Sequence, residues 1–289
     1  MLNRVKSRLL GRSHRLAILA AARFQQTGPG PPRSDTVEVE TTFARLLLPA
    51  DDEVITPALL ATSGWEPGET ALLGSRIAPG MTVVDGGAHV GYFTCLAARL
   101  VGPRGLVVAF EPNPRTFEIL LANVWRNGFA NVACFPWAIT DENDLARLFL
   151  SADNTGDNRL VDPGSGGSAV DVRTVRLDDA AVVMPPVDVV KLDLQGSEAA
   201  ALRGMELLLR ASPNVLVTTE FWPAGLLRAG ADPVGLLEYL RTLGFAVRVQ
   251  LPDEKGVLEL SDEQLLARCA ARDGGEGHVN LVLERRPGT

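Results

Sequence analysis

The chain has 289 residues, of which 46% are hydrophobic and 22% are charged. This composition is typical of a globular protein and excludes an intrinsically disordered chain, a collagen-like repeat and a disulfide scaffold. The net charge of −7 is unevenly spread: the first 34 residues carry seven basic side chains and no acidic one, and all 35 acidic residues follow them. Because so acidic a body repels phosphate backbones, we expect no nucleic-acid substrate.

Two predicted parts precede the main domain. Residues 1–34 form a basic arm that ends in a Pro/Gly-rich linker, residues 35–64 form a cap segment, and residues 65–289 form the main domain. The arm is typical of an organellar transit peptide, or of a basic helix that packs on the body or joins a partner subunit in a homo-oligomer. Its apolar stretch Leu16–Ala22 is shorter than the roughly 20 residues that a membrane-spanning helix needs, so we expect no membrane span.

Seven apolar runs of strand length alternate with helix-length segments after the linker. This alternation predicts an α/β fold with a largely parallel sheet, and continuous Val/Leu runs fit strands that are covered on both faces. The predicted strands are Thr82–Asp85, Leu106–Phe110, Val132–Trp137, Val187–Leu194, Val215–Phe221, Phe245–Gln250 and His278–Glu284.

Three helices between these strands have recognisable ends. Asn113 followed by Pro114 is typical of an N-cap and a first helical turn, and glycine or proline follows the apolar stripe of each helix. The predicted helices run from Pro114 to Asn127, from Ser197 to Pro213 and from Pro233 to Gly244.

Two segments break the alternation of strands and helices. In residues 145–178, two strand-like pieces flank a Gly/Ser/Asn-rich loop, which predicts an inserted hairpin beside the sheet. Long irregular loops in compact domains are often functional, so we expect this loop to shape the binding pocket. Residues 253–277 are charged and in part helical, and predict a solvated insertion before the last strand.

The sharpest motif is the run VVDGGAHVGYF at Val83–Phe93, in which a strand passes through a glycine turn into a helix. Such a turn brings backbone N–H groups close to a ligand. The spacing from Gly87 to Gly91 differs from the G-x-G-x-x-G of dinucleotide sites, and Asp85 at the strand tip would repel a pyrophosphate. The same acid suits S-adenosyl-L-methionine, whose sulfur and amino group are cationic.

A second acid, Glu111, ends the next predicted strand. It follows Gly91 by about 20 residues, the separation at which a carboxylate accepts hydrogen bonds from the ribose hydroxyls in a Rossmann-like unit. With strand and helix patterns on both sides, Glu111 and the glycine turn together predict a nucleoside-cofactor site.

Three blocks follow one another along the chain: PGMTVVDGGAHVGYFT at Pro79–Thr94, AFEPNPRTFEILLANVWRNG at Ala109–Gly128 and VDVVKLDLQGSEAAALRGM at Val187–Met205. In this order they resemble the FkbM-type family of S-adenosylmethionine-dependent methyltransferases. The last block is similar to the family's K-hydrophobic-D-hydrophobic-E-G-x-E signature. With DNTGDNRL between the second and third blocks and TTEFWP after the third, the resemblance extends from about Trp65 to about Gln250.

The resemblance implies a class I methyltransferase fold, in which a Rossmann-like sheet of seven mostly parallel strands has an antiparallel last strand and helices on both faces. It also implies methyl transfer to a hydroxyl of a sugar or secondary metabolite. The cofactor residues that it assigns are Asp85, Gly87, His89, Gly91, Glu111 and Asn113, the last near the expected adenine. Two positions depart from the family: His89 stands where Asn or Gly is common, and Gln195 replaces the usual Glu.

Two acids near predicted strand ends are the candidates for catalysis. A hydroxyl acceptor benefits from a positioned base, and ligands of open α/β sheets lie at the carboxyl ends of the strands. Asp193 and Glu220 both occupy such ends, where burial would raise the pKa of a carboxyl and poise it as a base. Alternatively, Asp193 pairs with Lys191 or caps the following helix, and Glu198 is an acid of a first helical turn.

The sequence says less about the roles of the three histidines and about a metal site. His89 is expected to contact the cofactor or to pack, and His14 and His278 to be structural or exposed. No set of three ligands suggests a metal site, and we expect no metal. Asp193 and Glu220 together are nonetheless of the type that holds a divalent ion.

Cys95, Cys134 and Cys269 lie far apart and form no CxxC motif, which predicts buried free thiols in a cytoplasmic protein. Two other functions stay open: an NAD-dependent oxidoreductase of Rossmann fold, and a non-catalytic binding module that keeps the fold. We further expect the arm and residues 36–64 to help to cover the active site as a lid that excludes water.

Overall fold

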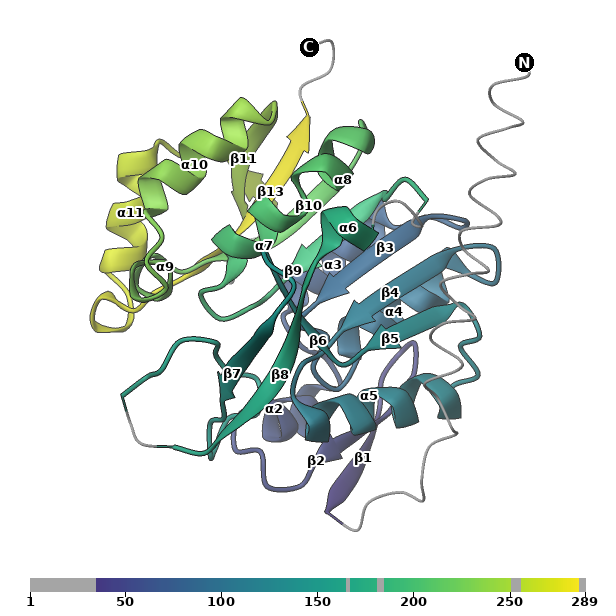
Figure 1. Cartoon of the computed structure of the whole chain (residues 1–289). Helices are drawn as coiled ribbons and strands as arrows, with labels where there is room; N and C mark the ends of the chain where they lie inside the picture. Colours follow the sequence, from purple (N-terminus) through teal and green to yellow (C-terminus); the bar gives the residue numbers. More distant parts are fainter. Residues whose placement is uncertain (1–34, 165–166, 181–184, 251–255, 286–289) are drawn as a thin grey trace, which may run out of the picture.

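The computed structural model describes residues 35–164, 167–180, 185–250 and 256–285. In this part of the chain, one large sheet lies between two layers of helices, with a smaller sheet and an N-terminal hairpin near its lower end (Figure 1). The basic arm of residues 1–34 lies outside the described residues.

The large sheet has the order β12-β11-β13-β10-β9-β3-β4-β5. Neighbouring strands from β10 to β5 are parallel, and β13 runs antiparallel to both β10 and β11. This arrangement confirms the predicted fold class, with the two-residue β12 added at one edge. The strands are β3 (Thr82–Gly86), β4 (Leu106–Phe110), β5 (Val132–Phe135), β9 (Val189–Leu192), β10 (Leu216–Phe221), β11 (Phe245–Gln250), β12 (Val257–Leu258) and β13 (Val279–Arg285).

Helices cover both faces of this sheet. Successive strand residues face opposite sides, so the continuous apolar runs present apolar side chains to both layers. The helices are α3 (Pro67–Arg76), α4 (Tyr92–Val101), α5 (Pro114–Arg126), α7 (Glu198–Gly204), α8 (Glu206–Ala211), α10 (Pro233–Thr242) and α11 (Asp262–Ala270), with the shorter α6 (Leu177–Ala180), α9 (Pro223–Arg228) and the 3-10 turn η2 (Asp273–Gly275). On β3, Val84 packs in the cluster beneath α7, α8, α10 and α11, whereas Val83 packs in the cluster beneath α3, α4 and α5.

Two predicted elements are each divided in the structure. The run Val132–Trp137 is not one strand: β5 ends at Phe135, and the chain passes Pro136 into another sheet, because proline has no N–H to continue the ladder. The helix predicted from Ser197 is two helices, α7 and α8, which meet at Met205. Gly204, just before that break, lies against the backbone of Thr140, where an added Cβ would be 1.9 Å from the carbonyl oxygen.

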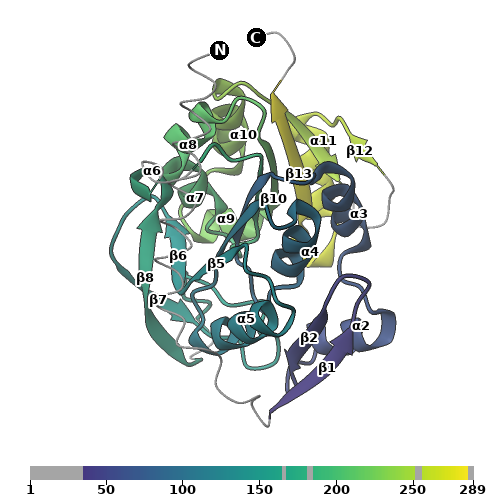
Figure 2. The same ribbon diagram turned by 90° about the vertical axis from the view of Figure 1, so that its right-hand side faces the viewer.

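The N-terminal segment is β1 (Thr36–Glu40), β2 (Arg45–Pro49) and α2 (Ile55–Thr62), and it lies beside α5 (Figure 2). β1 and β2 pair as an antiparallel hairpin. Asn123 on α5 binds this hairpin, because its Oδ1 accepts from Leu47 N at 2.7 Å and its Nδ2 donates to Leu47 O at 2.9 Å. A buried amide therefore attaches the segment to the main sheet's helical layer.

The predicted inserted hairpin is present as β7 (Leu145–Phe149) and β8 (Ala169–Arg176), which are antiparallel. With β6 (Trp137–Thr140), parallel to β8, they form a three-stranded sheet. We call residues 150–164 of the connection between β7 and β8 the insertion loop; residues 165–166 of this connection are not described.

Candidate active site

A cavity of about 810 Å³ lies at the carboxyl ends of β3, β4, β9 and β10. The strand order reverses between β3 and β9, and open α/β sheets bind their ligands at such a switch point. Among the predicted site residues, five line this cavity: Gly87, His89, Glu111, Asp193 and Glu220.

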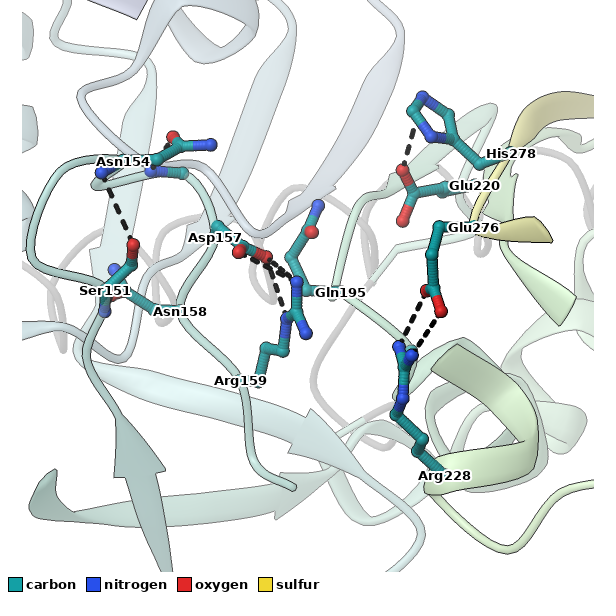
Figure 3. Close-up of polar contacts among 12 residues, drawn as sticks. Ser151, Asn154, Asp157, Asn158, Arg159, Gln195, Glu220, Arg228, Glu276 and His278 are labelled. Atoms are coloured by element: carbon teal, nitrogen blue, oxygen red, sulfur yellow. Dashed lines mark hydrogen bonds and ion pairs between the residues drawn. The ribbon is translucent and has the colours of Figure 1, made fainter. Parts of the chain in front are cut away.

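The cavity has two sides, one next to the glycine loop and one next to the insertion loop. The glycine-loop side consists of Gly87, His89, Glu111 and Asp193. The insertion-loop side consists of Arg159, Trp222, Arg228, Glu276 and His278, several of which Figure 3 shows. Glu220 lies at the end of β10, in the lining of the same cavity.

Close packing requires glycine at two of the predicted cofactor positions, Gly87 and Gly91. Gly87 has φ 73°, and a Cβ there would lie 1.9 Å from the carbonyl oxygen of Asp193. Gly91 has φ 91°, and its Cβ would lie 2.6 Å from Leu120 Cδ1 on α5. The loop therefore fits tightly between the end of β9 and α5, and Gly91 supports it from outside the cavity.

Asp85 lies behind the cavity wall, and only 1% of the residue is exposed. Its Oδ2 accepts a hydrogen bond from Thr94 Oγ1 at 2.5 Å, and its Oδ1 has no partner among the described residues. Burial raises the pKa of Asp85, against the opposing effect of the Lys191 ammonium on β9. Asp85 was predicted to contact the cofactor, but it does not line the cavity. It instead supports the start of α4 through Thr94.

Glu111 faces the cavity with most of its bonding capacity already used. Its Oε1 accepts from Asn113 N and Thr116 Oγ1, and its Oε2 accepts from His89 N, at 2.8 to 2.9 Å. Burial raises the pKa of Glu111 to about 7, although these hydrogen bonds oppose the rise. A carboxylate offers about four acceptor sites, so one on Oε2 remains for a ligand.

Asn113, the predicted adenine contact, does not line the cavity. Its Oδ1 accepts from Arg115 N at 3.0 Å, and this bond caps α5. The N-cap expected from the sequence is therefore present, and it uses the side-chain oxygen of Asn113.

Asp193 follows β9 and is held by two neighbours. Gln195 Nε2 donates to its Oδ1 at 2.6 Å, and Lys191 Nζ lies 3.5 Å from its Oδ2. Gln195 has φ 52°, a left-handed conformation that is uncommon for a residue with a side chain. The pairing of Asp193 with Lys191, one of the two alternatives for this acid, is present in the structure.

Glu198 has a structural role at the start of α7. Its two carboxylate oxygens accept from Leu194 N at 2.7 Å and Gly196 N at 3.0 Å, and the residue is fully buried. Burial raises its pKa to about 7. Because these backbone groups occupy the side chain, Glu198 orders the turn that carries Gln195.

Glu220 has an unsatisfied oxygen beside the cavity. Its Oε1 lies 3.7 Å from His278 Nε2, whereas its Oε2 is buried without a hydrogen-bond partner among the described residues (Figure 3). Burial raises its pKa well above the ordinary range, and the charges of Asp193 and Glu198 add to the rise. Such a carboxyl can hold or accept a proton at its unpaired oxygen.

Two guanidinium groups flank Trp222 on the insertion-loop side. The Cζ atoms of Arg159 and Arg228 lie 4.6 and 5.1 Å from the indole centroid, within the range of cation–π attraction. Arg159 pairs with Asp157 in the insertion loop, and Arg228 pairs with Glu276 (Figure 3). These contacts join the insertion loop, α9 and the segment before β13.

Comparison with known proteins identifies the family. The family model of the FkbM methyltransferase domain matches residues 85–247, more than half of the chain. The chain belongs to the FkbM methyltransferase family.

Relatives and solved structures are methyltransferases as well. "Methyltransferase 1" of Beauveria bassiana is 27% identical over 197 residues, which cover 59% of this chain and 74% of that protein. "Hexuronic acid methyltransferase AglP" of Haloferax volcanii is 25% identical over 158 residues, and the match spans 54% of this chain and 59% of that relative. The solved methyltransferase FkbM from Methylobacillus flagellatus is 14% identical, with a TM-score of 0.45 over 72% of this chain and 44% of that one.

Three residues at or beside the cavity, Glu66, Asp52 and Thr155, were not predicted as site residues from the sequence. Glu66 precedes α3 and lines the cavity, and its pKa rises to about 9 because of burial and the nearby Glu69 and Asp193. Thr155 bonds to His89 through its hydroxyl, and Asp52 accepts hydrogen bonds from Thr155. Thr155 lies in the run DNTGDNRL at Asp153–Leu160, which belongs to the family resemblance but does not indicate its partners, and only the packing of distant segments brings the three residues to the cavity.

Three further predictions concerned the cysteines, membrane-spanning helices and metal ligands. Cys95, Cys134 and Cys269 are buried free thiols, as expected. Within the described ranges, no helix is long and apolar enough to span a bilayer, and no three His, Cys, Asp or Glu side chains converge as a metal site requires. The cytoplasmic location and the pairing of the arm with a partner subunit stay predictions.

Proposed function

We propose that this FkbM family member transfers the methyl group of S-adenosylmethionine to a hydroxyl group of a sugar or secondary metabolite. The observation that carries the proposal is the convergence of Glu111, Asp193 and Glu220 on one cavity at the switch point of the sheet. The cavity volume of about 810 Å³ lies toward the upper end of the roughly 300–1,000 Å³ of ligand pockets, which suits two ligands side by side.

The residues of the glycine-loop side fit this cofactor. Glu111 Oε2 keeps an acceptor site for a ribose hydroxyl, and the turn at Gly87 lets the backbone approach closely. The carboxylate of Asp193 lines the same cavity and favours a cationic ligand over a pyrophosphate, and a bound cation would also favour ionisation of Glu66 and Glu220. When bound, S-adenosylmethionine supplies an activated methyl group on a positively charged sulfur.

Asp193 and Glu220 have different proposed roles. Asp193, fixed by Gln195 and Lys191, would orient the acceptor by accepting a hydrogen bond from a hydroxyl next to the reacting one. Glu220, with an unpaired oxygen and a raised pKa, would take the proton that the hydroxyl loses. Because an opposite charge nearby lowers the pKa of a carboxyl, Glu220 would act as a base only in the occupied cavity.

The insertion-loop side suits an acceptor that carries a carboxylate. The ion pairs of Arg159 with Asp157 and of Arg228 with Glu276 each use two guanidinium nitrogens. Within the described part of the chain, Arg159 Nη1 and Arg228 Nε therefore remain as further donors. Arginine favours carboxylates because its donors match their geometry. The relative AglP is named as a hexuronic acid methyltransferase, which supports a uronic acid as the acceptor to test first.

Calorimetric titration with S-adenosylhomocysteine and with NAD⁺ tests the cofactor. We expect the first to bind and the second not to bind; NAD⁺ binding without S-adenosylhomocysteine binding would favour the oxidoreductase instead. A screen of uronic acids and matched neutral sugars with labelled methyl donor then tests the acceptor. A cofactor that binds without any labelled product across cell extracts would favour the non-catalytic binding module.

A further inference from the structure

A chain of buried hydrogen bonds joins three segments that are far apart in the sequence. His89 in the glycine loop lies with its Nε2 2.7 Å from Thr155 Oγ1 in the insertion loop. Thr155 Oγ1 lies 2.5 Å from Asp52 Oδ2, and Thr155 N donates to the same oxygen at 2.8 Å. The chain thus links the N-terminal segment, the insertion loop and the glycine loop.

The Asp52 carboxylate is the acceptor end of this chain. Its Oδ1 accepts from the backbone N–H groups of Val54, Ile55 and Thr56 at 2.6 to 3.1 Å, at the start of α2. Although burial alone would raise the pKa of Asp52, the hydrogen bonds from Thr155 and from the backbone outweigh it and lower the pKa. Asp52 is therefore ionised at neutral pH and has no hydrogen to donate.

The ionised Asp52 determines which groups donate in the Thr155–His89 hydrogen bond. A threonine hydroxyl has a single hydrogen, and Asp52 requires it, so the Thr155 oxygen faces His89 as an acceptor. His89 must then donate from Nε2, which leaves Nδ1 without a hydrogen. Burial lowers the pKa of His89 to about 4, so the ring is neutral at physiological pH.

The ring of His89 is therefore an acceptor toward the cavity that it lines. Nδ1 has no hydrogen-bond partner among the described residues, and His89 belongs to the cavity lining. A ligand group that meets this nitrogen must be a donor, such as a hydroxyl or an ammonium. A phosphate or carboxylate oxygen, which only accepts, would be rejected.

We propose that Thr155 is a positioning residue, which fixes His89 in the Nε2–H tautomer so that Nδ1 accepts a hydrogen bond from a hydroxyl or ammonium group of the bound ligand. The same bond attaches the insertion loop and the N-terminal segment to the glycine loop. The identity of the ligand as an S-adenosyl compound, which carries both kinds of donor, rests on the proposed function. The tautomer does not depend on it.

The tautomer can be measured directly in the full chain by ¹⁵N NMR of the imidazole nitrogens. The chain has three histidines, so the spectrum of the ¹⁵N-histidine-labelled protein can be assigned with single replacements. We expect a protonated Nε2 and a bare Nδ1 for His89 in the unaltered protein and in Thr155→Ser. Thr155→Val, which keeps the shape and removes the hydroxyl, should populate both tautomers. A protonated Nδ1 in the unaltered protein, or an unchanged spectrum in Thr155→Val, would overturn the proposal.

Binding of S-adenosylhomocysteine tests the attachment of the loops. We expect Thr155→Val to weaken its affinity by about tenfold and to speed its dissociation, since a hydrogen bond to a charged group is lost, and Thr155→Ser to restore both. Thr174→Val is the matched control, because the Thr174 hydroxyl is also buried and donates to Glu142 O at 2.8 Å, away from the cavity. It should leave the affinity unchanged.

The outcomes separate this proposal from the proposed function. Equal affinities for the unaltered protein and Thr155→Val would refute the role of Thr155 and leave the cofactor assignment intact. If S-adenosylhomocysteine does not bind the unaltered protein, the cofactor assignment fails, and the imidazole spectrum still decides whether Thr155 sets the tautomer.

Discussion

The two sides of the cavity are built differently. On the glycine-loop side, Glu111 is 5% exposed and bonded to backbone N–H groups, and Gly87 packs against the backbone that follows β9. On the insertion-loop side, the Arg228 and Glu276 side chains are 43% and 44% exposed, and they come from the end of α9 and from the connection between η2 and β13. The sheet itself thus fixes the first side, whereas exposed side chains form much of the second and can change with less cost to the core.

This difference predicts the largest effect for Gly87→Ala. Because the new Cβ would lie 1.9 Å from the Asp193 carbonyl oxygen, the backbone must move, and the free energy of unfolding should fall by about 4 kcal/mol or more. Gly80→Ala is the control: Gly80 has φ 90° but nothing within 4 Å of its Cβ, so only the backbone strain of about 1 kcal/mol applies. Denaturant unfolding measures both. Equal losses in the two variants would contradict the tight fit of the loop.

Glu220→Gln should abolish most methyl transfer and leave cofactor binding in place. Glutamine keeps the shape of the side chain but cannot take a proton, so we expect the turnover to fall by roughly 100-fold or more. The affinity for S-adenosylhomocysteine should stay within about twofold, since a neutral glutamine replaces a carboxyl that burial already keeps largely protonated. Full turnover in Glu220→Gln would remove this acid as the base.

Gln195→Glu should shift the pH dependence of the reaction. The Gln195 amide nitrogen lies 2.6 Å from Asp193 Oδ1, so a carboxylate in its place would repel that of Asp193 and raise the pKa of the pair. We expect the pH of half-maximal rate to rise by about one unit, and the rate at neutral pH to fall by about tenfold. Gln195→Met, of similar length and without charge, separates repulsion from the lost hydrogen bond. The same pH profile in all three proteins would show that Gln195 does not act on Asp193.

The smallest effect concerns the stability of the protein as the pH changes. Burial beside Glu69 and Asp193 raises the pKa of Glu66 to about 9, so the folded state keeps a proton that the unfolded chain releases near its ordinary pKa of about 4.3. The contribution of Glu66 is therefore fully favourable below that pH and is lost as the pH rises toward 9. Glu66→Gln, which resembles the protonated acid, should unfold a few degrees higher at pH 8. The gap should close at pH 5, and a constant gap in thermal scans would contradict the shifted pKa.

The sequence predicted the features that local patterns encode. The apolar runs of β4 and β11 match their predicted bounds, the cap at Asn113 is present, and the glycine turn lies at the switch point. Glu111, Asp193 and Glu220 could be placed together because each ends a parallel strand of one sheet.

Contacts between distant segments could not be predicted in this way. Asp52 and Thr155 are 103 positions apart, and nothing in either local sequence indicates that they share a hydrogen bond. Asp85 has the residue type of a ligand contact, yet the depth at which β3 is buried places it behind the wall. The hydrophobic pattern of the sequence shows which residues end a strand. Which distant loop packs against that strand end depends on the packing of the whole chain.

A crystal structure of the full chain with S-adenosylhomocysteine would show whether the glycine-loop side holds the cofactor. We expect the ribose against Glu111, His89 Nδ1 accepting a hydrogen bond from the ligand, and the sulfur facing the cavity beside Asp193 and Glu220. A ligand bound elsewhere, or held with its ribose away from Glu111, would contradict this expectation.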